Sequence, residues 1–413
     1  MRIQNLKLEY IPIFAICSVD LFFSIVTVLG MSFQGSYYSP IYIIYNVAIF
    51  FVATILFIND MVIKQEKYTK NQVLMLGIPF VFIFSYLVSM LFENVTQRAT
   101  TQFLYFFLWG FSGIYLGIYF SEERRFIKSV KLMEIMMVIM SIATTRVLMQ
   151  VFIQDSRRVG IGGATYQTAS YIAAFVFGLN LYFLLFGKYH ERYPFFETRL
   201  YRFLSIGLLF IQAIATFSSS GRGAAVLIVV YVIFFLIRFK RKFLIKKIFK
   251  NFLFIPGAIV ISYLVFYFLR DIPIFINSFE RAFAFISTEG INWEGTSGRD
   301  VIYQETINII MNSPMIGYGI FGMWNVARHS PHNLFLEVVM QGGIIYLSIV
   351  IAILNFAIIK LFKMIKREKE MKIIVVLALY PATMLMFSGS YMIHLLFWFC
   401  LSFIMCYRPL STS

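Results

Sequence analysis

The sequence predicts an all-α polytopic membrane protein with about twelve transmembrane helices and one large extracytoplasmic loop. Its 413 residues are 60% apolar, 19% aromatic and only 14% charged, which is more apolar surface than a soluble globule of this length can bury. The apolar residues come in blocks of about 17–25, the length at which a helix crosses about 30 Å of hydrocarbon. Positive charge gathers in alternate connections between these blocks, which is typical of membrane topology.

Twelve blocks in chain order have the length and composition of membrane spans. They lie at about 10–30, 39–59, 73–92, 102–120, 132–152, 167–187, 203–219, 222–238, 251–269, 333–359, 373–389 and 390–407. We expect the first to be a retained span, because it lies too far from a basic leader and lacks a small-residue cleavage site. The chain thus divides into transmembrane helices 1–9 (1–269), a large extracytoplasmic loop with an amphipathic helix (270–332), and helices 10–12 (333–413).

The charge distribution predicts the orientation in the membrane. With the amino terminus in the cytosol, 27 of the 36 Lys and Arg fall on the inner side and nine on the outer side. This bias follows the positive-inside rule and places both termini in the cytosol, so the net charge of +16 mostly reflects topology. The basic run at 238–250 lies between two spans, so we interpret it as a loop that faces lipid headgroups and not as a nucleic-acid site.

Cysteine and histidine usage argues against redox and metal chemistry. The three cysteines all fall inside predicted spans without disulfide or CxxC spacing, and the four histidines form no metal-ligand cluster. These residues are Cys17, Cys400, Cys406, His190, His329, His332 and His394. We predict no bound metal and no cofactor.

Every cation left on the outer side is an arginine. The nine are Arg98, Arg146, Arg157, Arg158, Arg222, Arg270, Arg281, Arg299 and Arg328. Topology discourages lysine and arginine alike, so arginine alone on this side indicates a need for its planar fork, which binds phosphate or carboxylate bidentately. The alternative, which we assign to about half of them, is interfacial anchoring.

Two outer connections are long enough to hold chemistry: 153–166, which contains Arg157 and Arg158, and the one from about 270 to 330. In the second, Ser297 is the expected N-cap of an amphipathic helix that runs through Val301–Asn312 and stops at Pro314. Arg299 then lies in the first turn, where Asp300 complements the helix dipole. A glycine-rich turn follows at 317–322 and contains Tyr318.

The end of this loop predicts another helix start. Ser330 is the expected N-cap and Pro331 the first helical residue, so His332 lies in the first turn, where the dipole favours the neutral imidazole that can accept a proton. An interfacial histidine without chemistry is the alternative. Upstream, the Ser218–Gly223 turn places Arg222 at a third helix start; such N-termini with arginine forks favour an anion, whereas a tight turn without a ligand is the alternative.

Two acidic residues lie at membrane depth, Asp20 in the first span and Glu337 in the tenth, and buried charge there indicates a role. We expect Glu337 to form an ion pair that orients an outer arginine. For Asp20 we expect a structural hydrogen bond.

The order of these features resembles the O-antigen polymerase and ligase superfamily, the Wzy and WaaL type of bacterial membrane glycosyltransferase. The resemblance covers nearly the whole chain. It rests on the twelve-span plan, the large outer loop, and the motifs Ser219-Ser220-Gly221-Arg222-Gly223, Ser297-Gly298-Arg299, Pro314 with Gly317 and Gly319, His332-Asn333 and Gly342-Gly343.

The resemblance implies a GT-C-like enzyme that transfers glycan from undecaprenyl pyrophosphate at the outer face of the bacterial cytoplasmic membrane, without a metal. It implies that Arg222 and Arg299 bind the pyrophosphate and that His332 acts on the acceptor hydroxyl or helps to hold the diphosphate. The further candidate substrate-binding residues, in or beside these motifs and the 153–166 loop, are Arg157, Arg158, Tyr318, Asn333 and Glu337.

Among the possible activities we favour an O-antigen or capsule polymerase, with the lipid-linked oligosaccharide and membrane lipids as partners and a chain-length regulator as a further candidate. A ligase that uses another acceptor remains open, because it shares the site. A transporter or lipid-linked oligosaccharide flippase would have ionisable residues along a central cavity and internal repeats, and the sequence shows nearly charge-free spans and no repeat.

Overall fold

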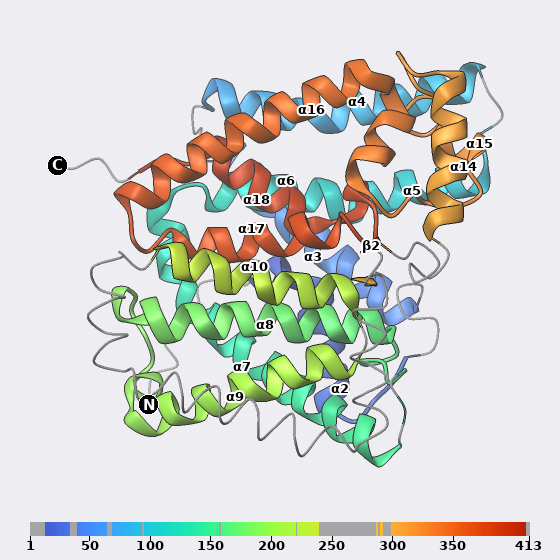
Figure 1. Ribbon diagram of the computed structural model, residues 1–413. Coiled ribbons are helices and arrows are strands. Elements are labelled where there is room, and N and C mark those ends of the chain that lie inside the picture. Colours follow the sequence, from blue (N-terminus) through green and yellow to red (C-terminus); the bar gives the residue numbers. More distant parts are fainter. Residues whose placement is uncertain are drawn as a thin grey trace.

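The computed structural model describes residues 13–33, 39–63, 68–92, 95–154, 156, 158–219, 221–238, 286–287, 290–291 and 299–409. In these ranges it is a bundle of long helices that run side by side, with α14 (Arg299–Asn312) set crosswise over one end of the bundle (Figure 1). The last described residues, up to 409, lie at the opposite end (Figure 1).

Described helices lie at eleven of the twelve predicted apolar blocks. Seven are long and apolar enough to cross a membrane: Pro40–Met61, Lys70–Leu91, Gln97–Phe120, Glu123–Ile153, Tyr166–Tyr189, Arg199–Ser218 and Leu334–Arg367. Four more are apolar but shorter: Ser18–Val28, Arg222–Ile237, Lys372–Met384 and Leu395–Cys406. A polytopic membrane protein is therefore confirmed, while the predicted ninth span, 251–269, lies outside the described residues.

Serine and threonine cap the N-termini of several of these helices, a position at which both residue types are common. Ser39, Thr96, Thr165 and Thr198 each accept a hydrogen bond from a backbone N–H in the first turn of the helix that follows. The helices that start there are α3 (Pro40–Ile58), α5 (Gln97–Tyr105), α8 (Tyr166–Phe186) and α9 (Arg199–Ser218). These starts match the predicted block edges to within a few residues.

The remaining elements complete the bundle and its ends. They are α1 (Ile13–Ile16), α2 (Ser18–Val28), η3 (Asn59–Ile63), α4 (Lys70–Phe92), η4 (Phe106–Phe111), α6 (Ser112–Phe120), α7 (Glu123–Ile153), η5 (Gly187–Tyr189), η6 (Pro194–Glu197), α10 (Arg222–Arg238), α15 (Met323–Val326), α16 (Leu334–Arg367), α17 (Lys372–Met384), η8 (Tyr391–Ile393) and α18 (Leu395–Cys406). A short antiparallel hairpin of β1 (Ile286–Ser287) and β2 (Gly290–Ile291) adds strand structure that the all-α prediction did not contain.

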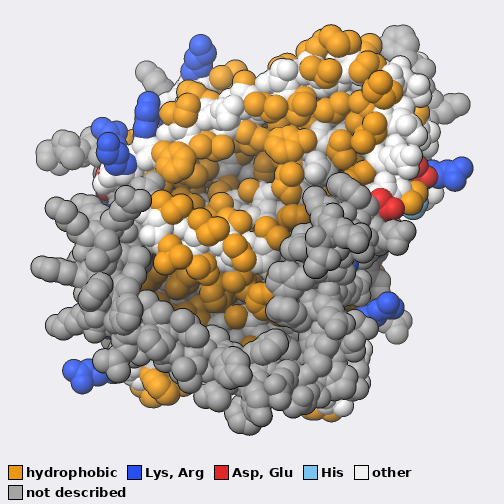
Figure 2. Space-filling model, viewed as in Figure 1, with side chains coloured by type: hydrophobic (Ala, Val, Ile, Leu, Met, Phe, Trp, Pro, Cys, Tyr) orange, Lys and Arg blue, Asp and Glu red, His pale blue; other side chains and the backbone are white. Residues whose placement is uncertain are grey.

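Helix α8 is the buried centre of one half of the bundle, where it packs against α7, α9, α10 and α17. In the other half α18 packs along α6. Helices α3, α4 and α16 lie outermost and leave much of their apolar surface exposed. Figure 2 shows hydrophobic side chains over much of the visible face, including α16, with most of the visible charged side chains toward its left and right ends, as expected of a lipid-facing wall.

Helix α16 is broken near its start, at Gly342 (φ −141°) and Gly343 (φ +63°). The loop after α14 forms hydrogen bonds with the backbone of α16 just before this break. The N–H of Tyr318 donates to Met340 O at 3.0 Å, and the N–H of Gly319 donates to Gln341 O at 2.7 Å. The two backbones approach so closely that a side chain on Gly343 would overlap the carbonyl of Met315. The break therefore fixes α14 and the first turns of α16 relative to each other.

Helices α17 and α18 meet in a segment that is buried inside the bundle. The helices have 13 and 12 residues, so each covers only about 18–20 Å along its axis, well short of about 30 Å of hydrocarbon. The segment between them includes Ser390, Tyr391 and Met392, which are all buried. Both helices are thus shorter than the neighbouring spans, and the segment that joins them is packed inside the protein.

Candidate functional site

Two of the three predicted helix starts carry their arginines as expected. Helix α10 begins at Arg222 and α14 begins at Arg299, with Asp300 in its first turn. The predicted N-cap of α14, Ser297, lies outside the described residues. Each guanidinium is therefore attached where free backbone N–H groups and the positive end of a helix dipole favour an anion.

Phe387, in the segment after α17, is the common neighbour of these two helix starts. The guanidinium carbon of Arg299 lies 5.9 Å from the centre of the Phe387 ring. A Cβ on Gly223, the residue after Arg222, would lie 3.0 Å from the Cβ of Phe387 and would overlap the hydroxyl of Tyr171. Arg299 also acts electrostatically on Tyr171, so the starts of α10 and α14 converge on Phe387 and Tyr171.

His332 reaches the same place through α16. The N–H of Leu334 donates to the carbonyl of Leu385 at 2.9 Å, two residues before Phe387. Asn333 and not Ser330 is the N-cap of α16, because its Oδ1 accepts from Phe335 N at 3.0 Å and from Leu336 N at 3.2 Å. The predicted cap was thus wrong by three residues.

His332 therefore precedes the helix instead of lying in its first turn. With φ of +51°, His332 has a left-handed backbone, which among the described residues is otherwise found only at glycines. This conformation costs a residue with a side chain about 1–2 kcal/mol. Neighbouring structure must hold it there, and the side chain then lies among the cations at this end of the bundle.

The imidazole of His332 is kept in its neutral form. Partial burial, followed by the charges of Arg299, His329 and Arg98, lowers the pKa of His332 below its usual 6.5. Its Nδ1 is buried and has no hydrogen-bond partner among the described residues. A neutral ring with an uncommitted nitrogen can accept a proton, or can donate to an anion from the other nitrogen.

Arg98 joins the cluster from the start of α5. Its guanidinium lies 4.2 Å from the centre of the Trp324 ring, and Nη1 donates to the carbonyl of Arg328 at 2.5 Å. These contacts tie α5 to the loop between α14 and α16. Arg98 was one of the nine outer arginines, but nothing in its sequence neighbourhood singled it out for this site.

Three of the predicted substrate-binding side chains have internal partners. Asn333 caps α16, the Tyr318 hydroxyl donates to Ile309 O at 2.8 Å, and the Ser390 hydroxyl donates to the carboxylate of Glu337. In the described part of the chain Glu337 therefore pairs with Ser390, where an arginine was expected. Each of these bonds holds the site together, and a contact with substrate remains a prediction.

The described residues of the outer loop at 153–166 make no contact with this cluster. Arg157 lies outside the described residues. Arg158 is exposed after α7, and its N–H donates to Ser156 Oγ at 3.4 Å. Among the residues described, no contact connects Arg158 with Arg222, Arg299 or His332. Its role in steering the substrate therefore remains a prediction.

Tyr171 and Phe387 are the site residues that sequence reasoning missed. Both are aromatic residues in or next to apolar spans, where the sequence is full of such residues, so no signal distinguished them. The residues that were found, Arg222, Arg299 and His332, stood out because they are polar residues at helix starts.

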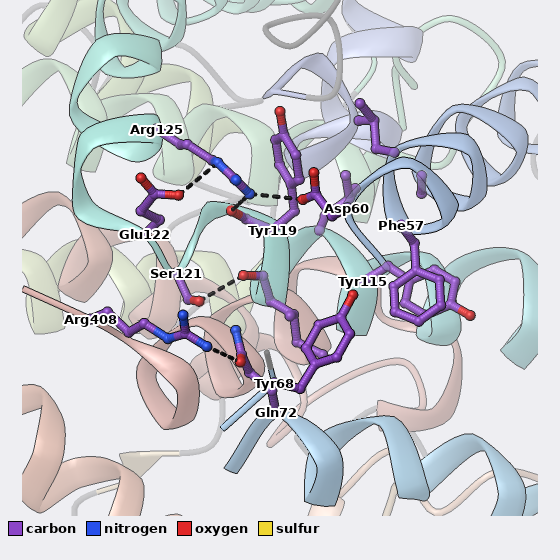
Figure 3. A pocket seen from close by; sticks show the side chains of 14 residues that line it. Phe57, Asp60, Tyr68, Gln72, Tyr115, Tyr119, Ser121, Glu122, Arg125 and Arg408 are labelled. Carbon is purple, nitrogen blue, oxygen red and sulfur yellow. Dashed lines mark hydrogen bonds and ion pairs between the residues drawn. The ribbon is translucent and has the colours of Figure 1, made fainter. Parts of the chain in front are cut away.

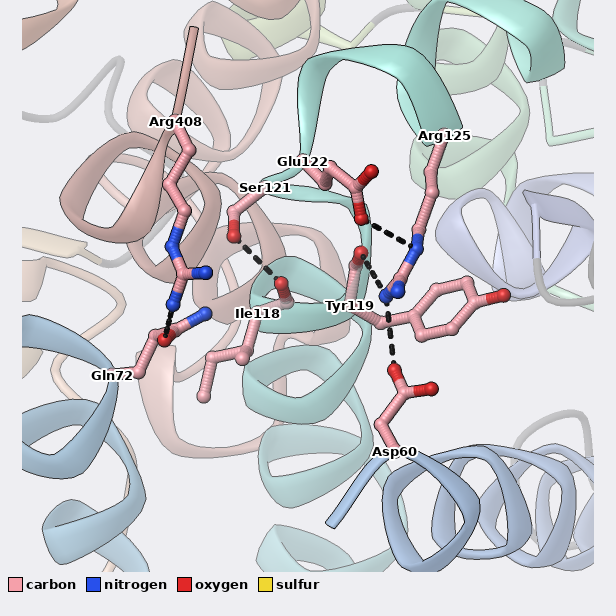
Figure 4. A network of polar contacts seen from close by, with 8 residues as sticks. All are labelled: Asp60, Gln72, Ile118, Tyr119, Ser121, Glu122, Arg125 and Arg408. Atoms are coloured by element: carbon pink, nitrogen blue, oxygen red, sulfur yellow. Dashed lines mark hydrogen bonds and ion pairs between the residues drawn. The ribbon is translucent and has the colours of Figure 1, made fainter. Parts of the chain in front are cut away.

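A second polar pocket lies at the opposite end of the bundle and is filled by its own partners (Figure 3). Arg125 contacts Asp60 and Glu122 at 2.9 Å each, and Arg408 donates to Gln72 (Figure 4). The remaining cavity of about 30 Å³ is the share of one water molecule. This cluster ties η3, α4, the start of α7 and the carboxyl-terminal segment together, and we interpret it as structural.

Comparison with known families finds one match, which covers about a third of the chain. Residues 207–351 are similar to the family model described as O-antigen ligase, Wzy_C, and this range contains Arg222, Arg299 and His332. That family is shared by Wzy polymerases and WaaL ligases, which are membrane glycosyltransferases acting on lipid-linked glycans. No curated protein and no solved structure matches the chain.

The matched region runs from within α9 through α10, α14 and α15 to the middle of α16. It includes the three helix starts and the glycine break, while Tyr171 and Phe387 lie before and after it in the sequence. The resemblance inferred from the motifs is confirmed by this match.

Proposed function

We propose that this protein is a polysaccharide polymerase that transfers glycan from undecaprenyl pyrophosphate to a lipid-linked repeat-unit acceptor. The observation that carries the proposal is the convergence of the starts of α10 and α14, with Arg222 and Arg299, on Phe387 next to the neutral His332. A phosphate-rich leaving group and a hydroxyl nucleophile need this combination of an anion clamp and a base.

The chemistry required of the protein is modest, because a glycosyl pyrophosphate already has a good leaving group. Arg222 and Arg299 stabilise the negative charge that develops on the departing pyrophosphate, with help from the dipoles of α10 and α14. His332 removes the proton of the acceptor hydroxyl, or holds the diphosphate through its other nitrogen. Holding donor and acceptor side by side supplies the remaining acceleration.

The short length of α17 and α18 supports a substrate that enters from the bilayer. If Lys372 and Arg408 lie at the inner surface, the ends of helices only about 18–20 Å long stop within the outer leaflet. Phe387, which follows α17, then lies below the outer headgroups, in the outer half of the bilayer. A pyrophosphate attached to an isoprenoid chain can reach them without leaving the membrane.

The direct test is polymerisation by the purified protein in nanodiscs, with its native undecaprenyl pyrophosphate repeat unit as sole substrate. We expect a ladder of longer lipid-linked glycans from the wild type and none from Arg222→Ala or Arg299→Ala. Arg199→Ala, at the exposed start of α9, is the control and should polymerise normally. Normal ladders from either site variant would refute the anion clamp.

A ligase is the second candidate, and the description of the matching family as O-antigen ligase favours it. A ligase would give no ladder from the repeat unit alone and would transfer glycan once a separate outer-core or protein acceptor is supplied. Movement of the carrier across the bilayer without any glycan transfer would indicate a flippase.

A further inference from the structure

A cavity of about 230 Å³ lies inside the bundle, next to the site at Phe387. Helix α2, the α5–η4 helix, α8, α17 and the segment 388–396 form its walls. Tyr171 lines this cavity, and its hydroxyl also lies against Gly223, the residue after Arg222. The cavity therefore adjoins the arginine site at Tyr171.

Several polar atoms around this cavity lack an internal partner. Ser18 Oγ, Gln102 Oε1, Trp109 Nε1 and the Tyr171 hydroxyl are buried and have no hydrogen-bond partner among the described residues. Buried polar atoms are normally satisfied, because leaving one unpaired costs its full desolvation free energy. Four such atoms from three different helices around one cavity indicate a hydroxylated occupant.

Aromatic rings and a carboxylate complete the lining. Tyr105 and Trp109 have ring centres 4.4 Å apart and contribute aromatic surface. Asp20 also lines the cavity, and one of its oxygens accepts from the Tyr380 hydroxyl at 2.8 Å, which confirms the hydrogen bond predicted for Asp20. This composition, in which aromatic and aliphatic side chains are combined with several polar groups, is typical of a small-molecule site.

We propose that this cavity binds one sugar ring of the lipid-linked glycan and so helps to select the glycan that is transferred. The proposal rests on the polymerase function proposed above. A sugar ring has apolar C–H faces that pack on Tyr105 and Trp109, and an edge of hydroxyls that pair with Asp20, Gln102 and Ser18. The cavity has room for the equivalent of about eight waters, at about 30 Å³ each, which suits one ring and not a chain of rings.

An isoprenoid tail is the competing occupant, because the cavity is also rich in apolar side chains. A tail would leave the four polar atoms unpaired and would place hydrocarbon against the Asp20 carboxylate. The polar atoms therefore favour the sugar.

The test compares two substitutions in the same helix. Gln102→Leu removes a polar group of the cavity at nearly constant volume, whereas Gln97→Leu changes the exposed first residue of α5, which does not line the cavity. The probe is the lipid-free repeat-unit oligosaccharide, released by mild acid from the native carrier, titrated into the full-length protein in nanodiscs. We expect its Kd to rise about tenfold in Gln102→Leu, as for loss of one buried hydrogen bond, and to stay unchanged in Gln97→Leu.

Ser18→Ala provides a second variant should Gln102→Leu fail to fold, and it should weaken oligosaccharide binding in the same direction. Undecaprenyl phosphate, which has the tail but no sugar, should bind all variants equally. Weaker binding of undecaprenyl phosphate with unchanged oligosaccharide binding would overturn the proposal in favour of a tail site. Unchanged binding of both probes would show a water-filled cavity and would overturn it as well.

The experiments distinguish a failure of the sugar subsite from a failure of the proposed polymerase function. A wild-type ladder that disappears in Arg299→Ala, together with unaltered oligosaccharide binding in Gln102→Leu, would remove the sugar subsite and leave the polymerase. Binding of the oligosaccharide that depends on Gln102, without any ladder from the wild type, would keep the subsite and remove the polymerase.

Discussion

At the scale of single residues, the presence of arginine and not lysine on the predicted outer side leads to a chemical hypothesis that can be tested. Arg299 combines a helix start, an aromatic neighbour and a nearby histidine, and lysine would keep its charge but lose the planar fork. We expect Arg299→Lys to lower kcat/KM by about 10–100-fold, as for the loss of one charge-assisted hydrogen bond. Initial rates of ladder formation at equal protein level measure this. A lysine variant as active as the wild type would show that charge alone suffices.

The neutral state of His332 predicts a pH dependence. Because burial and neighbouring cations lower the pKa of His332, its neutral form persists at pH values below 6.5 and only then gives way to the protonated, inactive form. Activity should therefore be flat around neutral pH and fall on the acid side. Arg98→Gln removes one of the cations, raises the pKa of His332 and should move this acid limb to higher pH.

The control for this experiment is Arg146→Gln, which removes an outer arginine that is not among the groups acting on His332. Its acid limb should coincide with that of the wild type. If the acid limb of the pH profile of Arg98→Gln stays in place or moves to lower pH, His332 is excluded as the titrating base.

Gly223 tests whether Tyr171 and Phe387 position Arg222. A Cβ at Gly223 would overlap the Tyr171 hydroxyl and come within 3.0 Å of Phe387, so Gly223→Ala should displace the start of α10 and lower activity at least tenfold. Tyr171→Phe removes the nearest clashing atom, and the double variant should recover part of the loss. Rates of ladder formation for the two single variants and the double variant give the coupling. Additive losses would mean that the two residues do not act on each other.

At the scale of elements, the break in α16 determines where His332 lies. Gly343 has φ +63°, and a side chain there would overlap the carbonyl of Met315, so Gly343→Ala has both a strained backbone and a steric clash. We expect it to separate the 314–319 loop from α16 and to abolish polymerisation. Gly207→Ala in α9 is the matched control, because a Cβ there meets no atom within 4 Å.

The readout for this pair is activity together with the amount of folded protein in detergent. Gly343→Ala should lose activity even in the fraction that remains folded, and Gly207→Ala should match the wild type in both. An active Gly343→Ala protein would show that the break is not needed to place His332.

Helix starts were predictable to the extent that their signals are local. The start of α10 was predicted correctly from the sequence Ser220-Gly221-Arg222. Asp300 correctly indicated the first turn of α14. The start of α16 was misplaced because Ser330, Pro331 and Asn333 all suit a cap, and only the bond from Leu334 N to Leu385 O selects Asn333. The partner of Glu337 was equally hidden, since Ser390 lies far along the chain.

At the scale of the whole molecule, hydropathy identified the membrane class and apolar helices at eleven of the predicted blocks, seven of them long enough to span a membrane, because each helix is read from its own residues. It could not show that α17 and α18 end inside the bundle, since their sequences are as apolar as full spans. Nor could it find the cavity beside Tyr171, because a cavity depends on how helices from distant parts of the chain pack. The candidate site was therefore predictable in its charged residues and not in its aromatic walls.

The orientation predicted from charge can be tested by cysteine labelling, and the protein provides a low background for this. Its native cysteines, Cys17, Cys400 and Cys406, are all buried. Arg328→Cys lies beside the arginine site, and Lys188→Cys lies at the other end of α8, in an exposed position. If the arginine site faces outward, a membrane-impermeant maleimide added to intact protoplasts should label Arg328→Cys and not Lys188→Cys.

Permeabilised protoplasts supply the control, because both variants should then be labelled to a similar extent. The positive-inside bias makes the predicted orientation the stable one, since reversing it would move 27 cations outward. Labelling of Lys188→Cys alone in intact protoplasts would reverse the topology. In that case the cations at Phe387 would face the cytosol, and a glycan donor would have to be used before it crosses the membrane, which would exclude polymerisation at the outer face.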